Sequence, residues 1–152
     1  MKQYTLNVTG YDYNQKALAS LMTEKNYIYS LPKSELLDEI AIDEDERVYE
    51  YEIAECTLQI LHEPTNQFDP AALRVYADGT PIGYVPRGYI DVLKKISMQP
   101  GLDMSVQIYG GKYKEIIYHQ DDDFYGTMEP KYFTIETVKS PFKAMMYFWW
   151  NA

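Results

Sequence analysis

The sequence feature that most constrains the fold is a series of short segments in which apolar and polar residues alternate, separated by turns that contain glycine. Residues 4–8 alternate with a period of two, which is typical of a strand with one buried face. Asp78-Gly79 separates two strand-like segments and is a strong hairpin signal, and Gly110-Gly111 separates two more. We therefore expect a chain built mainly from short antiparallel strands.

One longer stretch, residues 48–62, keeps this alternation but changes phase near Ala54 and Glu55. In a long strand such a slip indicates a bulge or a corner, which lets a small sheet bend far enough to close into a barrel. Residues 131–138 are expected to supply the last strand. The pattern predicts about six or seven short strands.

Three segments carry apolar residues at helical spacing: residues 14–23, residues 34–40 and the segment that follows Arg87. Asn14 is a candidate N-cap for the first of them, and the acidic residues 43–47 are interpreted as a solvated loop. The whole pattern favours a mainly β (α+β) fold, with two or three short helices on a small closed or half-open barrel.

The length of 152 residues predicts one domain. No apolar run approaches the roughly 20 residues that span a bilayer, and the N-terminal segment lacks the apolar stretch of a secretory signal. We therefore expect a cytoplasmic protein that does not engage a membrane. The one cysteine, Cys56, and the two histidines, His62 and His119, are too few for a cysteine-based zinc site. No metal site and no cofactor are expected.

The acidic residues are clustered rather than spread along the chain, whose net charge is −9. Residues 35–63 hold eleven carboxylates against Arg47 alone, whereas residues 74–119 hold six Lys or Arg against four acids. An acidic face and a mildly basic face are therefore compatible. This balance argues against strong, sequence-blind coating of DNA, which needs many phosphate contacts, but leaves room for a small and geometrically specific site.

The most informative stretch is residues 61–87. Its motif elements are Glu63-Pro64, Asn66, Phe68, Asp69, Ala72, the strand from Leu73 to Tyr76, the turn Asp78-Gly79, and Ile82-Gly83-Tyr84-Val85-Pro86-Arg87. This series resembles the HIRAN family. The resemblance implies one HIRAN-like domain over residues 1–140, with an insertion at about 14–55 like that of bacterial and phage members, followed by an aromatic C-terminal tail, 141–152.

The resemblance implies that the fold is an OB-like β-barrel. It also implies that the function is to capture the free 3′ end of single-stranded DNA. By motif position, Asp69 would accept a hydrogen bond from the terminal 3′ hydroxyl. Phe68 would lie beside the last nucleotide, and Asn66 would hold the same loop or a base edge.

Three further residues are assigned to the same site by the resemblance. Tyr84 and Arg87 occupy positions that face the terminal phosphates, and Tyr13 lies roughly where a base-stacking aromatic is found. The chemistry is consistent with these assignments, because an ionised carboxylate accepts a hydroxyl proton but repels a phosphate, and a guanidinium holds phosphate oxygens through parallel donors.

Simpler structural interpretations of these residues stay open at this point. Asp69 followed by Pro70 is typical of a helix start, so the carboxylate is also a candidate cap for backbone amides. Asn66 is a common turn former. Phe68 is a candidate plug between the loop and the barrel, and the alternation with Ile82 favours partial burial of Tyr84.

The function expected from these residues is a non-enzymatic module that binds single-stranded DNA at a 3′ hydroxyl end, in DNA repair, replication or phage DNA processing. No catalytic residue is assigned, since no phosphate loop or nucleophile motif occurs. The alternative is a protein-interaction or assembly module, in which the acidic segment 35–63 or a homodimer through the tail 141–152 forms the contact. A third alternative is a nuclease that uses acidic residues and a metal. Asp121, Asp122 and Asp123 are candidate cation ligands, but three consecutive side chains of a strand cannot all converge on one ion, which favours a solvated loop.

Overall fold

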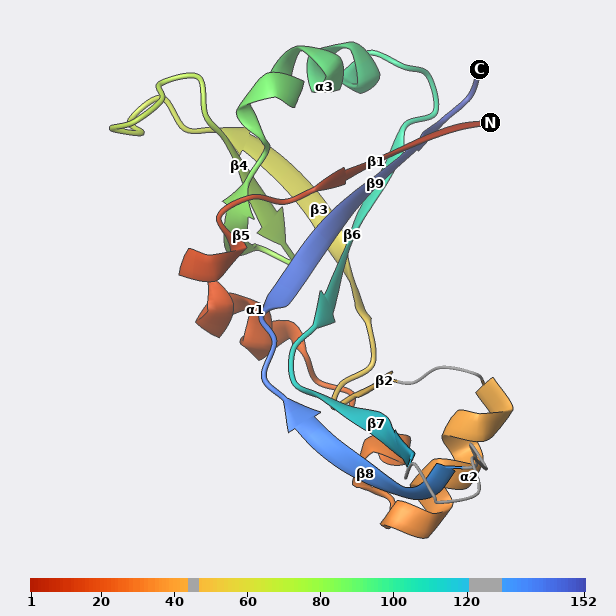
Figure 1. Ribbon diagram of the computed structural model, residues 1–152. Coiled ribbons are helices and arrows are strands. Elements are labelled where there is room, and N and C mark those ends of the chain that lie inside the picture. Colours follow the sequence, from red (N-terminus) through yellow and green to blue (C-terminus); the bar gives the residue numbers. More distant parts are fainter. Residues whose placement is uncertain (44–46, 121–129) are drawn as a thin grey trace. The chain divides into compact units, whose positions relative to one another are not determined.

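The computed structural model describes residues 1–43, 47–120 and 130–152, and in that part the chain has a β-rich α+β fold (Figure 1). The strands are β1 (Lys2–Asn7), β2 (Arg47–Tyr49), β3 (Ala54–His62), β4 (Leu73–Ala77), β5 (Thr80–Tyr84), β6 (Asp103–Gly110), β7 (Tyr113–Gln120), β8 (Pro130–Val138) and β9 (Phe142–Trp150). The helices are α1 (Gln15–Leu21), α2 (Lys33–Asp43) and α3 (Ile90–Ser97), with short 3-10 turns η1 (Tyr11–Tyr13), η2 (Tyr27–Ser30) and η3 (Arg87–Tyr89).

The chain divides into two compact units. The first unit contains Met1–Glu24, Ile53–Tyr109 and Pro141–Ala152. The second contains Lys25–Glu52 and Gly110–Ser140. The segment expected as an insertion, 14–55, is divided between the units: residues 14–24 and 53–55 belong to the first unit, and residues 25–52 belong to the second.

The first unit is built on a six-stranded sheet in the order β1-β9-β6-β3-β4-β5 (Figure 1). One face of this sheet is buried, because alternate residues along its strands point into the core. The largest buried side chains there include Val75, Ile82, Ile108, Met146 and Phe148. Helix α3 adds Leu93 and Ile96 to the same core, and its spacing matches the helix expected after Arg87.

The chain beyond β1 returns to the far edge of the sheet at β5. The backbone groups of Thr9 and Tyr84 exchange two hydrogen bonds of 2.9 Å, which makes an isolated antiparallel bridge. Gly83 permits this approach, because a Cβ at that position would collide with the Thr9 carbonyl oxygen and lie 2.6 Å from Val8 Cγ1. Its φ of 155° also lies outside the range that side chains favour. Among the described strands neither sheet is closed, so the expected barrel does not form by strand pairing alone.

Two sequence-based expectations about strand pairing are corrected by the sheet topology. Gly110-Gly111 was expected to turn a hairpin, but β6 pairs in the first sheet and β7 in a second sheet of order β2-β7-β8. Both glycines have positive φ, and they carry the chain from one sheet to the other. The phase slip near Ala54 likewise separates β2 from β3 and is not a bulge within one strand.

The residues set apart above as an aromatic tail form β9, which lies between β1 and β6. Its pairing with β1 runs from Lys2 opposite Trp150 to Asn7 opposite Met145. Because β9 has a hydrogen-bonded neighbour on each side, its backbone is not a free edge for pairing with a second copy. The alternation of Ala144, Met146 and Phe148 into the core explains the apolar composition of this segment.

The second unit has its own small core. Leu36 from α2, Val48 from β2 and Ile116 from β7 are buried together, with Tyr29 of η2 packed against them. Lys114 donates to the Tyr29 carbonyl oxygen at 2.6 Å and lies over its ring. No helix within the described ranges is both long enough and apolar enough to cross a membrane.

Candidate functional site

The loop between β3 and β4, residues 63–72, holds three of the predicted site residues, and Asn66 determines its shape. The Asn66 side-chain oxygen accepts hydrogen bonds from the backbone amides of Phe68 at 2.9 Å and Asp69 at 3.0 Å. This is an Asx-type turn, in which a side chain replaces a backbone carbonyl. Asn66 therefore holds the loop, which is one of the two roles expected for it. The two backbone amides already occupy its side-chain oxygen.

Glu63 anchors the start of this loop and was not assigned to the site from the sequence. Its carboxylate accepts hydrogen bonds from the Tyr84 hydroxyl at 2.9 Å, the Asn66 side-chain amide at 3.0 Å and Arg74 Nη1 at 3.1 Å. The Arg74 guanidinium also lies over the Tyr84 ring, 5.7 Å from its centre. Glu63 thus joins the loop to β4 and β5.

These contacts change the proton affinities of Glu63 and Tyr84. The hydrogen bond from the Tyr84 hydroxyl lowers the pKa of Glu63, the bonds from Asn66 and Arg74 lower it further, and desolvation acts in the opposite direction. Burial and the hydrogen bond to Glu63 raise the pKa of Tyr84. The Tyr84 proton is therefore committed to Glu63, which leaves Tyr84 without a donor to offer a phosphate.

Replacing Tyr84 by phenylalanine is expected to raise the pKa of Glu63 towards its ordinary value, because the strongest bond to the ionised carboxylate is removed. A carboxyl-carbon NMR titration measures this pKa directly. Since the pKa of Glu63 is lowered in the folded protein, its contribution to stability is present above the ordinary carboxyl range and is lost as the pH falls through the folded pKa.

The matched control is Tyr89→Phe, which removes a hydroxyl from an exposed ring. It is expected to leave the titration of Glu63 unchanged. A Glu63 pKa that does not rise in Tyr84→Phe would contradict the assignment of Tyr84 as its principal partner.

Asp69 uses both carboxylate oxygens within the protein. Oδ1 accepts from the Ala71 amide at 2.9 Å, and Oδ2 lies 3.2 Å from Arg87 Nε. Pro70 and Ala71 form a turn, so the expectation that Asp69 starts a helix is wrong, although its carboxylate does cap a backbone amide. Each ionised oxygen keeps a further acceptor site, because a carboxylate offers about four in all.

Two adjoining cavities in the first unit bring the six predicted site residues together. The larger, of about 700 Å³, is lined by Tyr13, Asn66, Phe68 and Tyr84, with Glu63. The smaller, of about 260 Å³, is lined by Asn66, Phe68, Asp69, Tyr84 and Arg87, with Ala72 and Val85. Asn66, Phe68 and Tyr84 border both cavities.

The rings of Tyr13 and Phe68 are the most exposed features of the larger cavity, each with 90% of its surface accessible. The interpretation of Phe68 as a buried plug is therefore wrong. A single exposed apolar side chain is common on a protein surface, whereas exposed apolar groups gathered at one cavity are typical of a contact site. Two exposed rings at one cavity offer flat faces for another ring.

Tyr13 reaches the cavity through the turn that follows β1. Gly10 adopts a left-handed conformation, with φ of 77°, and the Asn14 side chain donates to its carbonyl oxygen at 2.7 Å. Asn14 therefore braces η1, and it makes no side-chain cap on α1, contrary to expectation. The Gln15 amide binds both backbone groups of Phe142 at 2.8 Å, which fixes this turn to β9.

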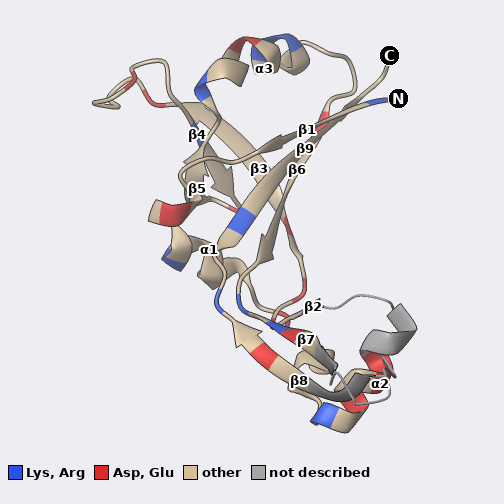
Figure 2. Ribbon diagram, viewed as in Figure 1, with Lys and Arg blue, Asp and Glu red and all other residues tan. Residues whose placement is uncertain are grey.

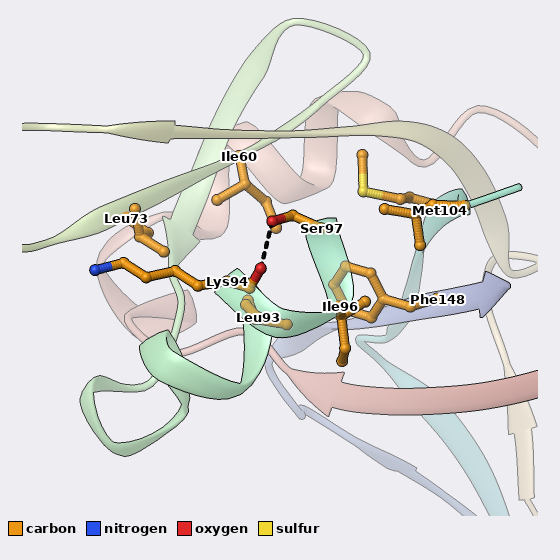
Figure 3. A pocket seen from close by; sticks show the side chains of 9 residues that line it. Ile60, Leu73, Leu93, Lys94, Ile96, Ser97, Met104 and Phe148 are labelled. Atoms are coloured by element: carbon orange, nitrogen blue, oxygen red, sulfur yellow. Dashed lines mark hydrogen bonds between the residues drawn. The ribbon is translucent and has the colours of Figure 1, made fainter. Parts of the chain in front are cut away.

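A third cavity, of about 300 Å³, lies beneath α3 (Figure 3). It is lined mainly by apolar side chains of α3 and the sheet, among them Ile60, Leu93, Met104 and Phe148. Its one hydroxyl, that of Ser97, donates to the Lys94 carbonyl oxygen within the helix. The Ser97 hydroxyl is therefore already used within the helix.

Comparisons with protein-family models, with curated proteins and with solved structures found no match. Within the part of the chain that the structure describes, no group of three His, Cys, Asp or Glu side chains is arranged to hold a metal ion. Asp121, Asp122 and Asp123 lie outside the described residues.

Proposed function

We propose that the first unit binds single-stranded DNA at a 3′ hydroxyl end. The observation that carries this proposal is the Asp69–Arg87 pair, which lies beside the two exposed rings of Tyr13 and Phe68 at adjoining cavities. A carboxylate can accept a hydrogen bond from a hydroxyl, and a guanidinium can hold a phosphate. An aromatic ring can stack on a base.

Asp69 selects the end in this mechanism. The Asp69 side chain is only 23% exposed, and Arg87 Nε holds its carboxylate in place, so it presents a fixed acceptor to a hydroxyl donor. A terminal phosphate would bring a second negative charge against it and is disfavoured. An internal linkage offers no free hydroxyl at this position, so the carboxylate separates a free end from continuous backbone.

Arg87 contacts the phosphate that precedes the terminal nucleotide. Its Nε is committed to Asp69, but its side chain is 77% exposed, and the two Nη groups remain available as a planar pair of donors. The ion pair with Asp69 limits the rotamers of this long side chain, so less conformational entropy is lost on binding. One positioned guanidinium is consistent with modest affinity and a shallow dependence on salt.

We also propose that the first unit is an OB-like barrel of the HIRAN type, in which the Thr9–Tyr84 bridge completes the ring of strands. The motif of residues 61–87 supports this assignment, since it supplies the loop, the hairpin and the start of η3 at the site. On this view the protein is a non-enzymatic cytoplasmic module, with single-stranded DNA as its partner.

Replacing Phe68 or Tyr13 by alanine is expected to weaken binding of a 3′ hydroxyl single strand about fivefold to a hundredfold, because base–aromatic stacking contributes about 1–3 kcal/mol per base. The stability of the fold should barely change, since both rings are 90% exposed. Fluorescence anisotropy of a 5′-labelled oligonucleotide measures the affinity.

Tyr27→Ala is the matched control, because Tyr27 is also an exposed tyrosine in a 3-10 turn but belongs to the second unit. It is expected to bind like the unaltered protein. If Phe68→Ala, Tyr13→Ala and Tyr27→Ala all bind equally well, the rings do not stack on bases and the proposed site is incorrect.

A further inference from the structure

The six-stranded sheet has a second, solvent-facing side, and β1 and β9 form part of it. The β9 face consists of Gln3 and Thr5 of β1 and of Lys143, Met145, Tyr147 and Trp149 of β9. The register places Gln3 opposite Trp149 and Thr5 opposite Tyr147, so these side chains share one face. Gln3, Thr5 and Lys143 are exposed, while the other three are partly exposed.

An aromatic pair lies on this face. The rings of Tyr147 and Trp149 are stacked, with centres 5.8 Å apart and planes within 13° of each other. Core packing does not require them, because the neighbouring Met146 and Phe148 already fill the buried side of β9. Aromatic side chains on an open sheet are platforms on which unpaired bases stack in several classes of nucleic-acid-binding protein.

The charge of these strands differs from that of the rest of the chain. Residues 1–11 and 137–152 contain three lysines and no Asp or Glu, although the protein has 23 acidic residues. Figure 2 shows β1 and β9 without acidic residues. Carboxylates of the same sheet are on other strands, such as Asp103 on β6 and Glu55 on β3. β1 and β9 thus carry lysines and no carboxylate of their own, so they do not repel a polyanion.

The β9 face continues from the end-binding cavities. Lys143, at its start, lies with its ammonium 5.8 Å from the centre of the Tyr11 ring. Tyr11 and Tyr13 belong to the same turn, η1, and Tyr13 lines the larger cavity. From Lys143 to Trp149 the strand extends about 20 Å, at about 3.3 Å per residue.

We propose that the β9 face binds the nucleotides adjoining the captured 3′ end, with Lys143 contacting a phosphate and Tyr147 and Trp149 stacking on bases. This inference rests on the proposed function, and it adds a second binding surface and a direction for the strand. It predicts that affinity rises with strand length, because a single OB-type fold can contact about 4–16 nucleotides.

The test compares a thymidine trinucleotide with a thymidine dodecanucleotide, both ending in a 3′ hydroxyl. The dodecanucleotide is expected to bind at least about tenfold tighter, which corresponds to one stacked base or more. Lys143→Glu should weaken binding of the dodecanucleotide and leave binding of the trinucleotide nearly unchanged. Lys95→Glu, an equal charge change at an exposed position of α3, is the control.

A spectroscopic measurement locates the contact independently of affinity. In the Trp150→Phe variant Trp149 is the single remaining tryptophan, since the chain has two. The dodecanucleotide is expected to quench its fluorescence, and the trinucleotide is not. Quenching should persist when the dodecanucleotide ends in a phosphate and is supplied at saturating concentration, because the β9 face does not read the end.

The outcomes separate the two proposals. If both oligonucleotides bind equally, with the 3′ hydroxyl preference intact and no quenching of Trp149, the β9 face is not a binding surface and the end-binding function stands. If neither oligonucleotide binds, the proposed function is incorrect and this inference is overturned with it.

Discussion

Replacing Asp69 by asparagine is expected to abolish the preference for a 3′ hydroxyl end over a 3′ phosphate end. Asparagine retains the size of the side chain and an oxygen for the Ala71 amide, but it loses the charge that pairs with Arg87 and repels phosphate. A hydrogen bond to a charged group contributes about 1.5–3 kcal/mol, so binding of the hydroxyl strand should fall about tenfold to a hundredfold. Binding of the phosphate strand should rise or stay the same.

The direction of the two changes distinguishes end recognition from damage to the loop. A distorted loop would weaken both strands, since Phe68 precedes Asp69 and depends on the same Asn66 turn. Asp69→Ala provides the second variant, because it removes the cap and the charge together. If Asp69→Asn keeps the full preference for the hydroxyl end, the carboxylate does not read the terminus. Anisotropy titrations with the two strands at one salt concentration measure both affinities.

Replacing Gly83 by alanine is expected to destabilise the first unit by about 3 kcal/mol or more, because overpacking and an unfavourable backbone conformation act at the same residue. The new Cβ would collide with the Thr9 carbonyl oxygen, which is part of the bridge to Tyr84. The φ of 155° adds strain for any residue with a side chain. Separation of these strands would also displace Tyr84 and the turn that holds Tyr13, so DNA binding should be lost as well.

Gly88→Ala is the matched control for this variant. A Cβ at Gly88 meets nothing within 4 Å, and the residue is free of the positive φ found at Gly83. Its stability should stay within about 0.5 kcal/mol of the unaltered protein. Urea unfolding followed by tryptophan fluorescence compares the variants, since both tryptophans are in β9 of the same sheet. Equal stability of the two variants would show that the close approach of Thr9 to β5 does not support the fold.

Features set by local chemistry could be predicted from the sequence. The hairpin at Asp78-Gly79 is confirmed, because both residues adopt the positive φ that this turn requires and β4 pairs with β5 around them. The segment after Arg87 is confirmed as a helix, since Leu93 and Ile96 recur at helical spacing and are buried. The six predicted site residues line adjoining cavities because five of them come from one short motif.

Features that depend on distant partners could not be predicted. The alternation in residues 142–150 was obscured because, apart from Lys143, the outward side chains are also apolar or aromatic. Only the pairing with β1 and β6 shows that the segment is an interior strand. Glu63 was present in the motif, but its partners Arg74 and Tyr84 are 11 and 21 residues further along the chain. Pattern alone also cannot decide whether Gly110-Gly111 turns a hairpin or connects two sheets.

The central claim is that this protein recognises the chemical nature of a strand's terminus. The most direct test is a titration of the unaltered protein with two single strands of identical sequence that differ only in the 3′ group. We expect the strand with the 3′ hydroxyl to bind at least about tenfold more tightly than the strand with the 3′ phosphate, as one charge-assisted hydrogen bond would produce. Equal affinities, or tighter binding of the phosphate, would contradict the account.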